Sequence, residues 1–64
     1  MIEKTDRQII QFLEENGPSL LGEVVKELKL SYVKGLKRTN YLLSKGIIKH
    51  SEKTLQYELN PGTK

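Results

Sequence analysis

The stretch EVVKELKLS (residues 23–31), continued by YVKGLKRTNYLLSKGII (residues 32–48), decides the fold of this chain. Apolar residues in the first part recur at helical spacing, which predicts a helix over residues 22–29. Ser31 is a favoured residue for capping the start of a second helix, and Gly46 suits the left-handed position after its end. About three residues separate the two helices, which is the spacing of a helix-turn-helix.

Upstream of this motif, the pattern predicts a first helix over residues 6–16. Its apolar side chains lie on one stripe, and Thr5 and Gln8 have the spacing of a capping box. Gly17 is placed to end the helix, because glycine readily adopts the left-handed conformation. Leu20–Leu21 is then expected to form a short extended segment before the second helix.

After Gly46 the apolar period changes from helical to alternating, which predicts two short strands over residues 47–52 and 54–60. The segment 51–54 is the compact turn between them. On the second strand, alternation places one set of apolar side chains on the inner face: Leu55, Tyr57 and Leu59. The expected fold class is therefore mainly α, with a three-helix bundle and a two- or three-stranded antiparallel hairpin.

Length and composition limit what this chain can be. Its 64 residues predict a single domain over 1–64, with an ordered core over about 5–60. It has no cysteine and one histidine, His50, which excludes disulfides and leaves no basis for a metal site or a cofactor. No apolar run approaches the ~18 residues of a membrane span. We expect a soluble protein that is cytoplasmic or nucleoid-associated, without a membrane partner.

Charge is divided unevenly along the sequence. Residues 1–27 have a net charge of −3, and residues 28–64 have a net charge of +6. Between Glu27 and Glu52 there are six basic residues and no acidic one. Such a division predicts that one face of the molecule binds a polyanion.

The third predicted helix, over residues 32–45, concentrates this positive charge on one side. At 100° per residue the inward side is expected to hold Leu36, Thr39, Leu42 and Leu43, with Gly35 at its margin. The opposite side is expected to hold Lys34, Lys37, Arg38, Tyr41, Ser44 and Lys45, with Asn40 at its edge. Lysine binds phosphate oxygens, arginine can bind guanine and asparagine can bind adenine. A helix also fits the major groove of B-DNA, so double-stranded DNA is the expected partner.

In order and spacing, these segments resemble the winged helix-turn-helix. The ending LLSKGII is similar to the point where the recognition helix enters the wing in MarR-, ArsR- and Lrp-type regulators. The resemblance covers about residues 5–60. It implies a small transcription regulator that inserts helix 32–45 into the major groove, with the 51–54 hairpin as its wing. Together with the helix face, it implies these DNA contacts: Ser31, Tyr32, Lys34, Lys37, Arg38, Asn40, Tyr41, Lys45, Lys49 and Lys53.

The sequence departs from the family pattern at two positions of that helix. Gly35 replaces a residue that is usually apolar and costs the helix about 1 kcal/mol relative to alanine. Thr39 replaces a core apolar residue, so the helix is expected to pack slightly rotated. Replacing Lys37 or Arg38 by alanine is expected to weaken DNA binding without lowering thermal stability.

Other interpretations of the sequence are open. A winged-helix module for protein–protein assembly in nucleic-acid machinery is the main alternative function. Binding to RNA or to an unusual form of DNA is a further alternative. An enzyme is not expected, because no residue is spaced to activate Ser31 as a nucleophile and Asp6 and the glutamates form no acid–base pair. These acidic residues are instead expected to be solubilising surface residues, and Asp6 is also favourable at a helix start. Ile2 and Ile10, with Met1, are candidates for a weak or DNA-assisted homodimer contact. No small-molecule effector is evident. Abundant lysine and glutamate without alanine suggest an archaeal or thermophilic host.

Overall fold

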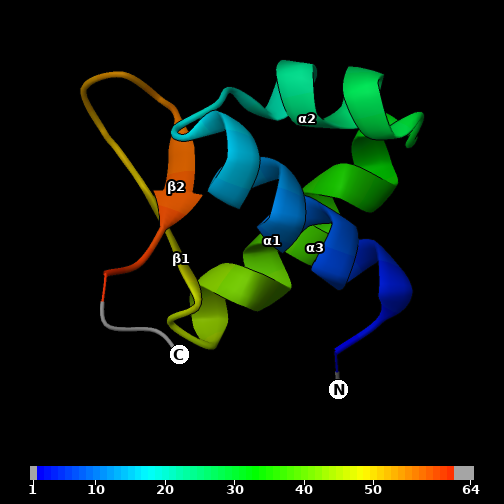
Figure 1. Ribbon diagram of the computed structural model, residues 1–64, viewed down its shortest axis with the longest axis horizontal. Coiled ribbons are helices and arrows are strands. Elements are labelled where there is room, and N and C mark those ends of the chain that lie inside the picture. Colours follow the sequence, from blue (N-terminus) through cyan, green and yellow to red (C-terminus); the bar gives the residue numbers. More distant parts are fainter. Residues whose placement is uncertain (1, 62–64) are drawn as a thin grey trace.

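The computed structural model describes residues 2–61 and has three helices followed by one hairpin (Figure 1). The elements are α1 (Lys4–Asn16), α2 (Leu21–Leu28), α3 (Tyr32–Ser44), β1 (Ile48–His50) and β2 (Tyr57–Leu59). The helices pack on one another in a bundle, and the hairpin lies along one side of it, close to α1. This arrangement confirms the predicted fold class. Met1 and residues 62–64, the ends of the predicted domain, lie outside the described residues.

The start of α1 differs from the predicted capping box. The helix begins at Lys4, with Glu3 as its N-cap, so Thr5 lies inside the first turn. The Asp6 side chain accepts a hydrogen bond from the Glu3 backbone N–H at 2.8 Å. The predicted capping box between Thr5 and Gln8 was therefore wrong, because Asp6, and not Gln8, accepts from the backbone amide that precedes the helix.

A tight turn joins α2 to α3. Lys29 has a left-handed backbone with φ of 56°, and the Leu30 N–H donates to the Val25 carbonyl at 2.9 Å. Ser31 caps α3 as predicted, because its hydroxyl oxygen accepts from the Lys34 backbone N–H at 3.1 Å. The helix-turn-helix is thereby confirmed, although α2 begins at Leu21.

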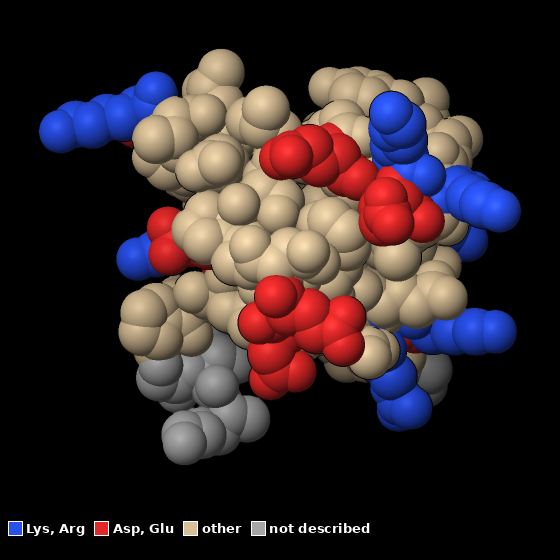
Figure 2. All heavy atoms as spheres, turned by 45° about the horizontal axis from the view of Figure 1, so that its top comes forward, with Lys and Arg blue, Asp and Glu red and all other residues tan. Residues whose placement is uncertain are grey.

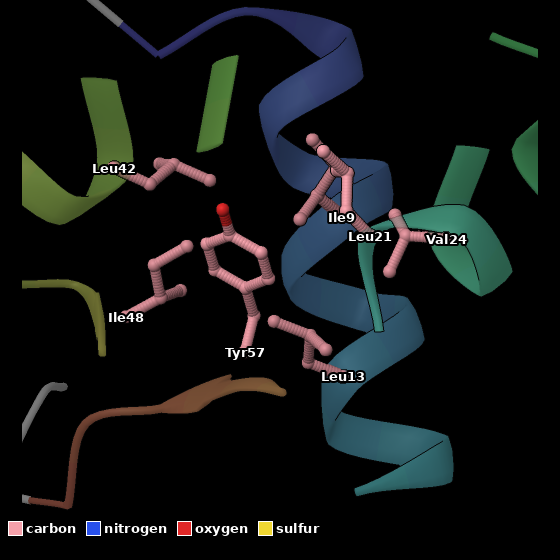
Figure 3. Close-up of a cluster of buried hydrophobic side chains, with 7 residues drawn as sticks. All are labelled: Ile9, Leu13, Leu21, Val24, Leu42, Ile48 and Tyr57. Carbon is pink, nitrogen blue, oxygen red and sulfur yellow. The ribbon is translucent and has the colours of Figure 1, made fainter. Parts of the chain in front are cut away.

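The core is made of seven buried apolar side chains from all three helices and both strands (Figure 3). They are Ile9, Leu13, Leu21, Val24, Leu42, Ile48 and Tyr57. The Tyr57 ring reaches from β2 into the middle of this cluster. This position confirms the packing role expected of Tyr57.

The inward side of α3 differs from the predicted one. Its buried residues are Gly35, Thr39 and Leu42. Leu36 is 36% exposed and Leu43 is only half-buried. The Thr39 hydroxyl is satisfied in the core because it donates to the Leu36 carbonyl at 3.0 Å. The helix is thus rotated relative to the predicted wheel, in line with the rotation expected from threonine at position 39.

The hairpin is shorter than the predicted strands. Its antiparallel register pairs Ile48 with Leu59 and His50 with Tyr57. Ser19 adds one antiparallel bridge to Tyr57. The Ser19 N–H donates to the Tyr57 carbonyl at an N···O distance of 2.9 Å, and the Tyr57 N–H donates to the Ser19 carbonyl at 2.7 Å. The extended segment therefore lies at Ser19, because Leu21 already belongs to α2. Leu55 was predicted on the inner face, but its φ of 63° takes it out of the strand and leaves it 59% exposed.

Candidate nucleic-acid interface

The outward side of α3 is exposed except at Arg38 and Tyr41, which are half-buried, and it contains no acidic residue. Around the helix axis, at 100° per residue, its side chains form two flanks with Lys37 between them. One flank contains Lys34, Arg38, Tyr41 and Lys45. The other contains Val33, Leu36 and Asn40. The cationic flank was predicted as a group, whereas the two exposed apolar residues of the second flank were not predicted to face outward.

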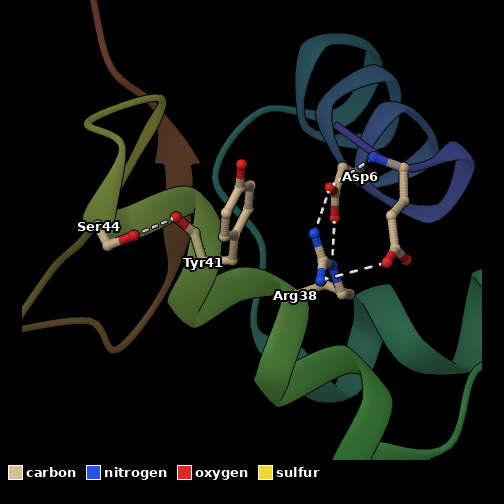
Figure 4. Close-up of polar contacts among 5 residues, drawn as sticks. Asp6, Arg38, Tyr41 and Ser44 are labelled. Carbon is tan, nitrogen blue, oxygen red and sulfur yellow. Dashed lines mark hydrogen bonds and ion pairs between the residues drawn. The ribbon is translucent and has the colours of Figure 1, made fainter. Parts of the chain in front are cut away.

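Arg38 is held by the start of α1 (Figure 4). Its Nε donates to one Asp6 carboxylate oxygen and its Nη2 to the other, both at 2.7 Å. The Asp6 side chain is fully buried, and 18% of the Arg38 side chain is exposed. Two-point pairing of this kind fixes the guanidinium plane as well as its position.

The pairing changes the ionisation of both groups. Hydrogen bonding from the Arg38 guanidinium lowers the pKa of Asp6 below its usual value of 3.8, against the opposing effect of burial. The same contact raises the pKa of Arg38. Asp6 is therefore a buried partner of α3, and its predicted role as a surface solubilising residue was wrong. Because removing Arg38 would leave a buried carboxylate without its ionic partner, we now expect R38A to lower thermal stability, contrary to the sequence-based expectation.

A shallow hollow of about 310 Å³ lies beside the first turns of α3. The residues around it are Glu3, Ser31, Val33, Lys34, Lys37 and Arg38. The Glu3 carboxylate lies 3.5 Å from Nη1 of Arg38 and its side chain is 49% exposed. Glu3 thus brings a negative charge to the edge of the lysine-bearing surface. No local pattern in the sequence indicates this placement, because Glu3 is 31 positions before Lys34.

Tyr41 and Lys45 extend the cationic flank toward the end of α3. The guanidinium carbon of Arg38 lies 4.6 Å from the centre of the Tyr41 ring, and Nζ of Lys45 lies 5.7 Å from it. Both are cation–π distances. The Ser44 hydroxyl donates to the Tyr41 carbonyl at 2.7 Å. Tyr41 is half-buried, so Lys45 is the exposed end of this flank.

The wing presents Lys49 on β1 and Lys53 in the turn, and both are exposed. The His50 ring stacks on the Tyr57 ring with centroids 4.1 Å apart, and its Nε2 lies 3.0 Å from the Leu55 carbonyl oxygen. These contacts make His50 a structural residue of the hairpin. They also fix the backbone that displays the exposed Leu55 side chain.

The remaining predicted residues fall into two groups. Ser31, Tyr32 and Asn40 are exposed on or beside α3, and Tyr32 is 60% exposed. Of the proposed dimer contacts, Ile2 is 37% exposed, whereas Ile10 packs partly buried against the core. In residues 2–61, no cluster of three or more His, Cys, Asp or Glu is placed to hold a metal ion. No helix in that range is long and apolar enough to cross a membrane.

Acidic side chains gather on another part of the surface. Figure 2 shows carboxylates toward the middle of one face, while lysines and arginines project mainly from its edges. A hollow between α1 and α2 contains Glu15, Glu23 and Glu27 in its lining, together with the cation of Lys26. None of its lining residues comes from α3 or the hairpin. The division of charge in the sequence therefore corresponds to different faces of the fold.

Comparison with known proteins identifies a structural relative. No protein-family model matches the sequence, and no curated protein matches it. The Zalpha domain of PKZ from Carassius auratus, solved in complex with Z-DNA, aligns with a TM-score of 0.82. The alignment covers 88% of this chain and 92% of that chain, at 24% sequence identity. This likeness shows the winged helix-turn-helix fold.

Proposed function

We propose that this protein binds double-stranded DNA through α3 and the wing. The observation that carries the proposal is the outward side of α3, which exposes lysines and contains no acidic residue along its 13 residues. An ordinary exposed helix face of this length mixes acids with lysines, because opposite charges four residues apart stabilise the helix. Uncompensated lysines instead favour a polyanionic ligand.

The proposed contacts to the phosphate backbone come from both elements. Lys34 and Lys37 border the hollow beside the start of α3, and Lys45 lies at its end. Lys49 and Lys53 place two more cations on the wing. These five lysines are the phosphate ligands of the proposal, while Ser31, Tyr32 and Tyr41 are neighbouring contacts.

Arg38 takes a different part in the proposed interface from the one expected of it. Its Nε and Nη2 already donate to Asp6 and its Nη1 lies 3.5 Å from Glu3, so the side-on donor pair of the guanidinium is engaged inside the protein. We assign to Arg38 the role of fixing the rotation of α3 and supporting the Tyr41 ring. Phosphate contact then supplies most of the affinity.

The structural relative supports DNA as the ligand, because that domain was solved in complex with Z-DNA. The same complex favours a second candidate, in which this face of the chain binds a left-handed duplex. We propose the right-handed form first, since an α-helix fits the B-DNA major groove. The resemblance of LLSKGII to MarR-, ArsR- and Lrp-type regulators supports the narrower proposal of a small transcription regulator.

A salt titration tests the proposal. Five phosphate contacts predict that log Kd against log salt concentration has a slope of magnitude 4 to 5 for B-form duplex. The double variant K34A/K37A is expected to reduce this magnitude by about 2, because two fewer lysines neutralise phosphates. The matched control K26A removes an exposed lysine of α2 and is expected to leave it unchanged.

Two outcomes would contradict this proposal in different ways. Absence of duplex binding at low salt, or a slope near zero, would reject DNA as the ligand and favour the protein-assembly alternative. Binding to a duplex locked in the left-handed form, with none to the B form, would keep DNA but reject insertion of α3 into the major groove.

A further inference from the structure

We propose that α3 favours A·T base pairs: Val33 and Leu36 contact thymine methyl groups, and Asn40 binds adenine. This inference rests on the proposed binding of B-form DNA and specifies which sequences that site prefers. The observation that carries it is the second flank of α3, which contains Val33, Leu36 and Asn40 and lies opposite the cationic flank.

The three side chains form a continuous row. Positions 33, 36 and 40 are three and four residues apart, so they are neighbours on one side of the helix. Val33 is 62% exposed and Leu36 is 36% exposed, and both lie in the first half of α3. In helix-turn-helix proteins it is the first part of the recognition helix that contacts base edges.

An apolar side chain at that position can recognise only one feature of a base edge in the major groove. Guanine and adenine present hydrogen-bonding atoms there, and cytosine presents an amino group, whereas thymine also presents a C5-methyl group. Val33 and Leu36 offer no donor or acceptor from their side chains. Their complementary surface is therefore the thymine methyl group.

Asn40 supplies the polar part of the same row. Its side chain is exposed, and the side-chain carboxamide makes no hydrogen bond within residues 2–61. A carboxamide can donate to N7 and accept from the N6 amino group of adenine at the same time. Adenine recognition by Asn40 and thymine recognition by Leu36 would thus select the same base pair, or adjacent ones.

Guanine recognition is disfavoured on the opposite flank. Arg38 is the only arginine of α3, and the buried Asp6 carboxylate holds two of its nitrogens at 2.7 Å. Lys34 lies on the same flank as Arg38 and borders the hollow next to Glu3, away from the row of Val33 and Asn40. Two of the three guanidinium nitrogens of Arg38 are therefore engaged inside the protein, which leaves the lysines of α3 as the more available cations for a guanine edge.

The test compares three duplexes of equal length and flanking sequence. The first has an A·T centre, the second has the same centre with deoxyuridine in place of thymidine, and the third has a G·C centre. Deoxyuridine removes the methyl group and keeps the base pairing. We expect the uracil duplex to bind about fourfold more weakly for each thymine methyl group that Val33 or Leu36 covers, and the G·C duplex to bind more weakly still.

Variants assign the preference to individual residues. V33S/L36S is expected to bind the thymine and uracil duplexes equally, with an unchanged salt dependence. N40A is expected to reduce the preference for A·T over G·C while keeping the thymine-to-uracil ratio. L20S is the control, because Leu20 is an exposed leucine outside α3. Circular dichroism confirms that each variant is folded.

Equal affinity of the wild-type protein for the thymine and uracil duplexes would overturn this inference, as would equal affinity for A·T and G·C centres. Either result would leave duplex binding itself intact. Absence of binding to all three duplexes would instead overturn the proposed function, and with it the sequence preference. A methyl effect that persists in V33S/L36S would show that residues elsewhere recognise the methyl group, which also overturns the inference.

Discussion

Replacing Gly35 with alanine is expected to destabilise the protein, although alanine is the better helix former. Gly35 is buried where α3 meets α2, and a Cβ atom built on it would overlap Cγ1 of Val25. Leu21 Cδ1 and Val25 Cβ would lie at 3.6 and 3.7 Å, so the methyl group has close neighbours on this side. The glycine is thus required for the close approach of the two helices.

The magnitude follows from two opposing effects. Alanine gains about 1 kcal/mol over glycine in helix propensity. Overpacking of a buried contact costs about 1–3 kcal/mol, and Val25 yields little because a β-branched side chain in a helix has one strongly preferred rotamer. Since Cγ1 lies at the end of a short side chain attached directly to α2, the backbone must also shift. We expect a net loss of about 1 kcal/mol, which is roughly 4–8 °C in Tm for a domain of this size.

Thermal unfolding of four proteins measures this effect. They are the wild type, G35A, V25A and G35A/V25A. V25A removes the methyl group that the added Cβ atom of G35A would overlap. We therefore expect the double variant to lose less free energy of unfolding than the sum of the losses in G35A and V25A. A G35A variant with a Tm equal to or above that of the wild type would refute the argument that α2 requires a glycine here. Simple additivity in the double variant would place the cost elsewhere than at Val25.

Three further predictions concern the ends of the helices. The pKa of Asp6 is lowered in the folded state, so its contribution to stability is present above about pH 4 and is lost as the pH falls through the folded pKa. D6N should therefore flatten the dependence of Tm on pH in this acidic range. A dependence equal to that of the wild type would contradict the pairing. S31A should lose about 1 kcal/mol in thermal unfolding because α3 loses its cap, whereas S44A should lose less. E3Q should tighten duplex binding about twofold at low salt through weaker repulsion of phosphate, and weaker binding would reject this role of Glu3.

The order of elements was predictable because local signals specify it. Ser31 caps α3, and Gly17 and Gly46 adopt the positive φ values of 76° and 73° expected after helix ends. The change from helical to alternating apolar spacing located the hairpin. Such signals depend on neighbouring residues in the sequence, so they do not require knowledge of how the helices pack.

The Asp6–Arg38 pair was not predictable, because its partners are 32 positions apart and each has an ordinary local explanation. Aspartate in a first helical turn is favoured by the helix dipole whether or not it is buried. Arginine on a basic helix is expected at a DNA surface. Only the packing of α1 on α3 brings the two together, and this contact gives a predicted base reader a structural role.

One rotation of α3 accounts for these differences. The predicted inward side was centred between Leu36 and Leu42, whereas the buried residues are Gly35, Thr39 and Leu42, a turn of roughly 40° at 100° per residue. Gly35 allows this orientation because it lets α2 approach closely. The same turn moves Arg38 toward α1 and moves Leu36 outward beside Val33. Gly35 therefore lowers the helix propensity of α3 and also determines which of its side chains face a ligand. A variant that restores the predicted orientation would turn Leu36 inward and Arg38 outward.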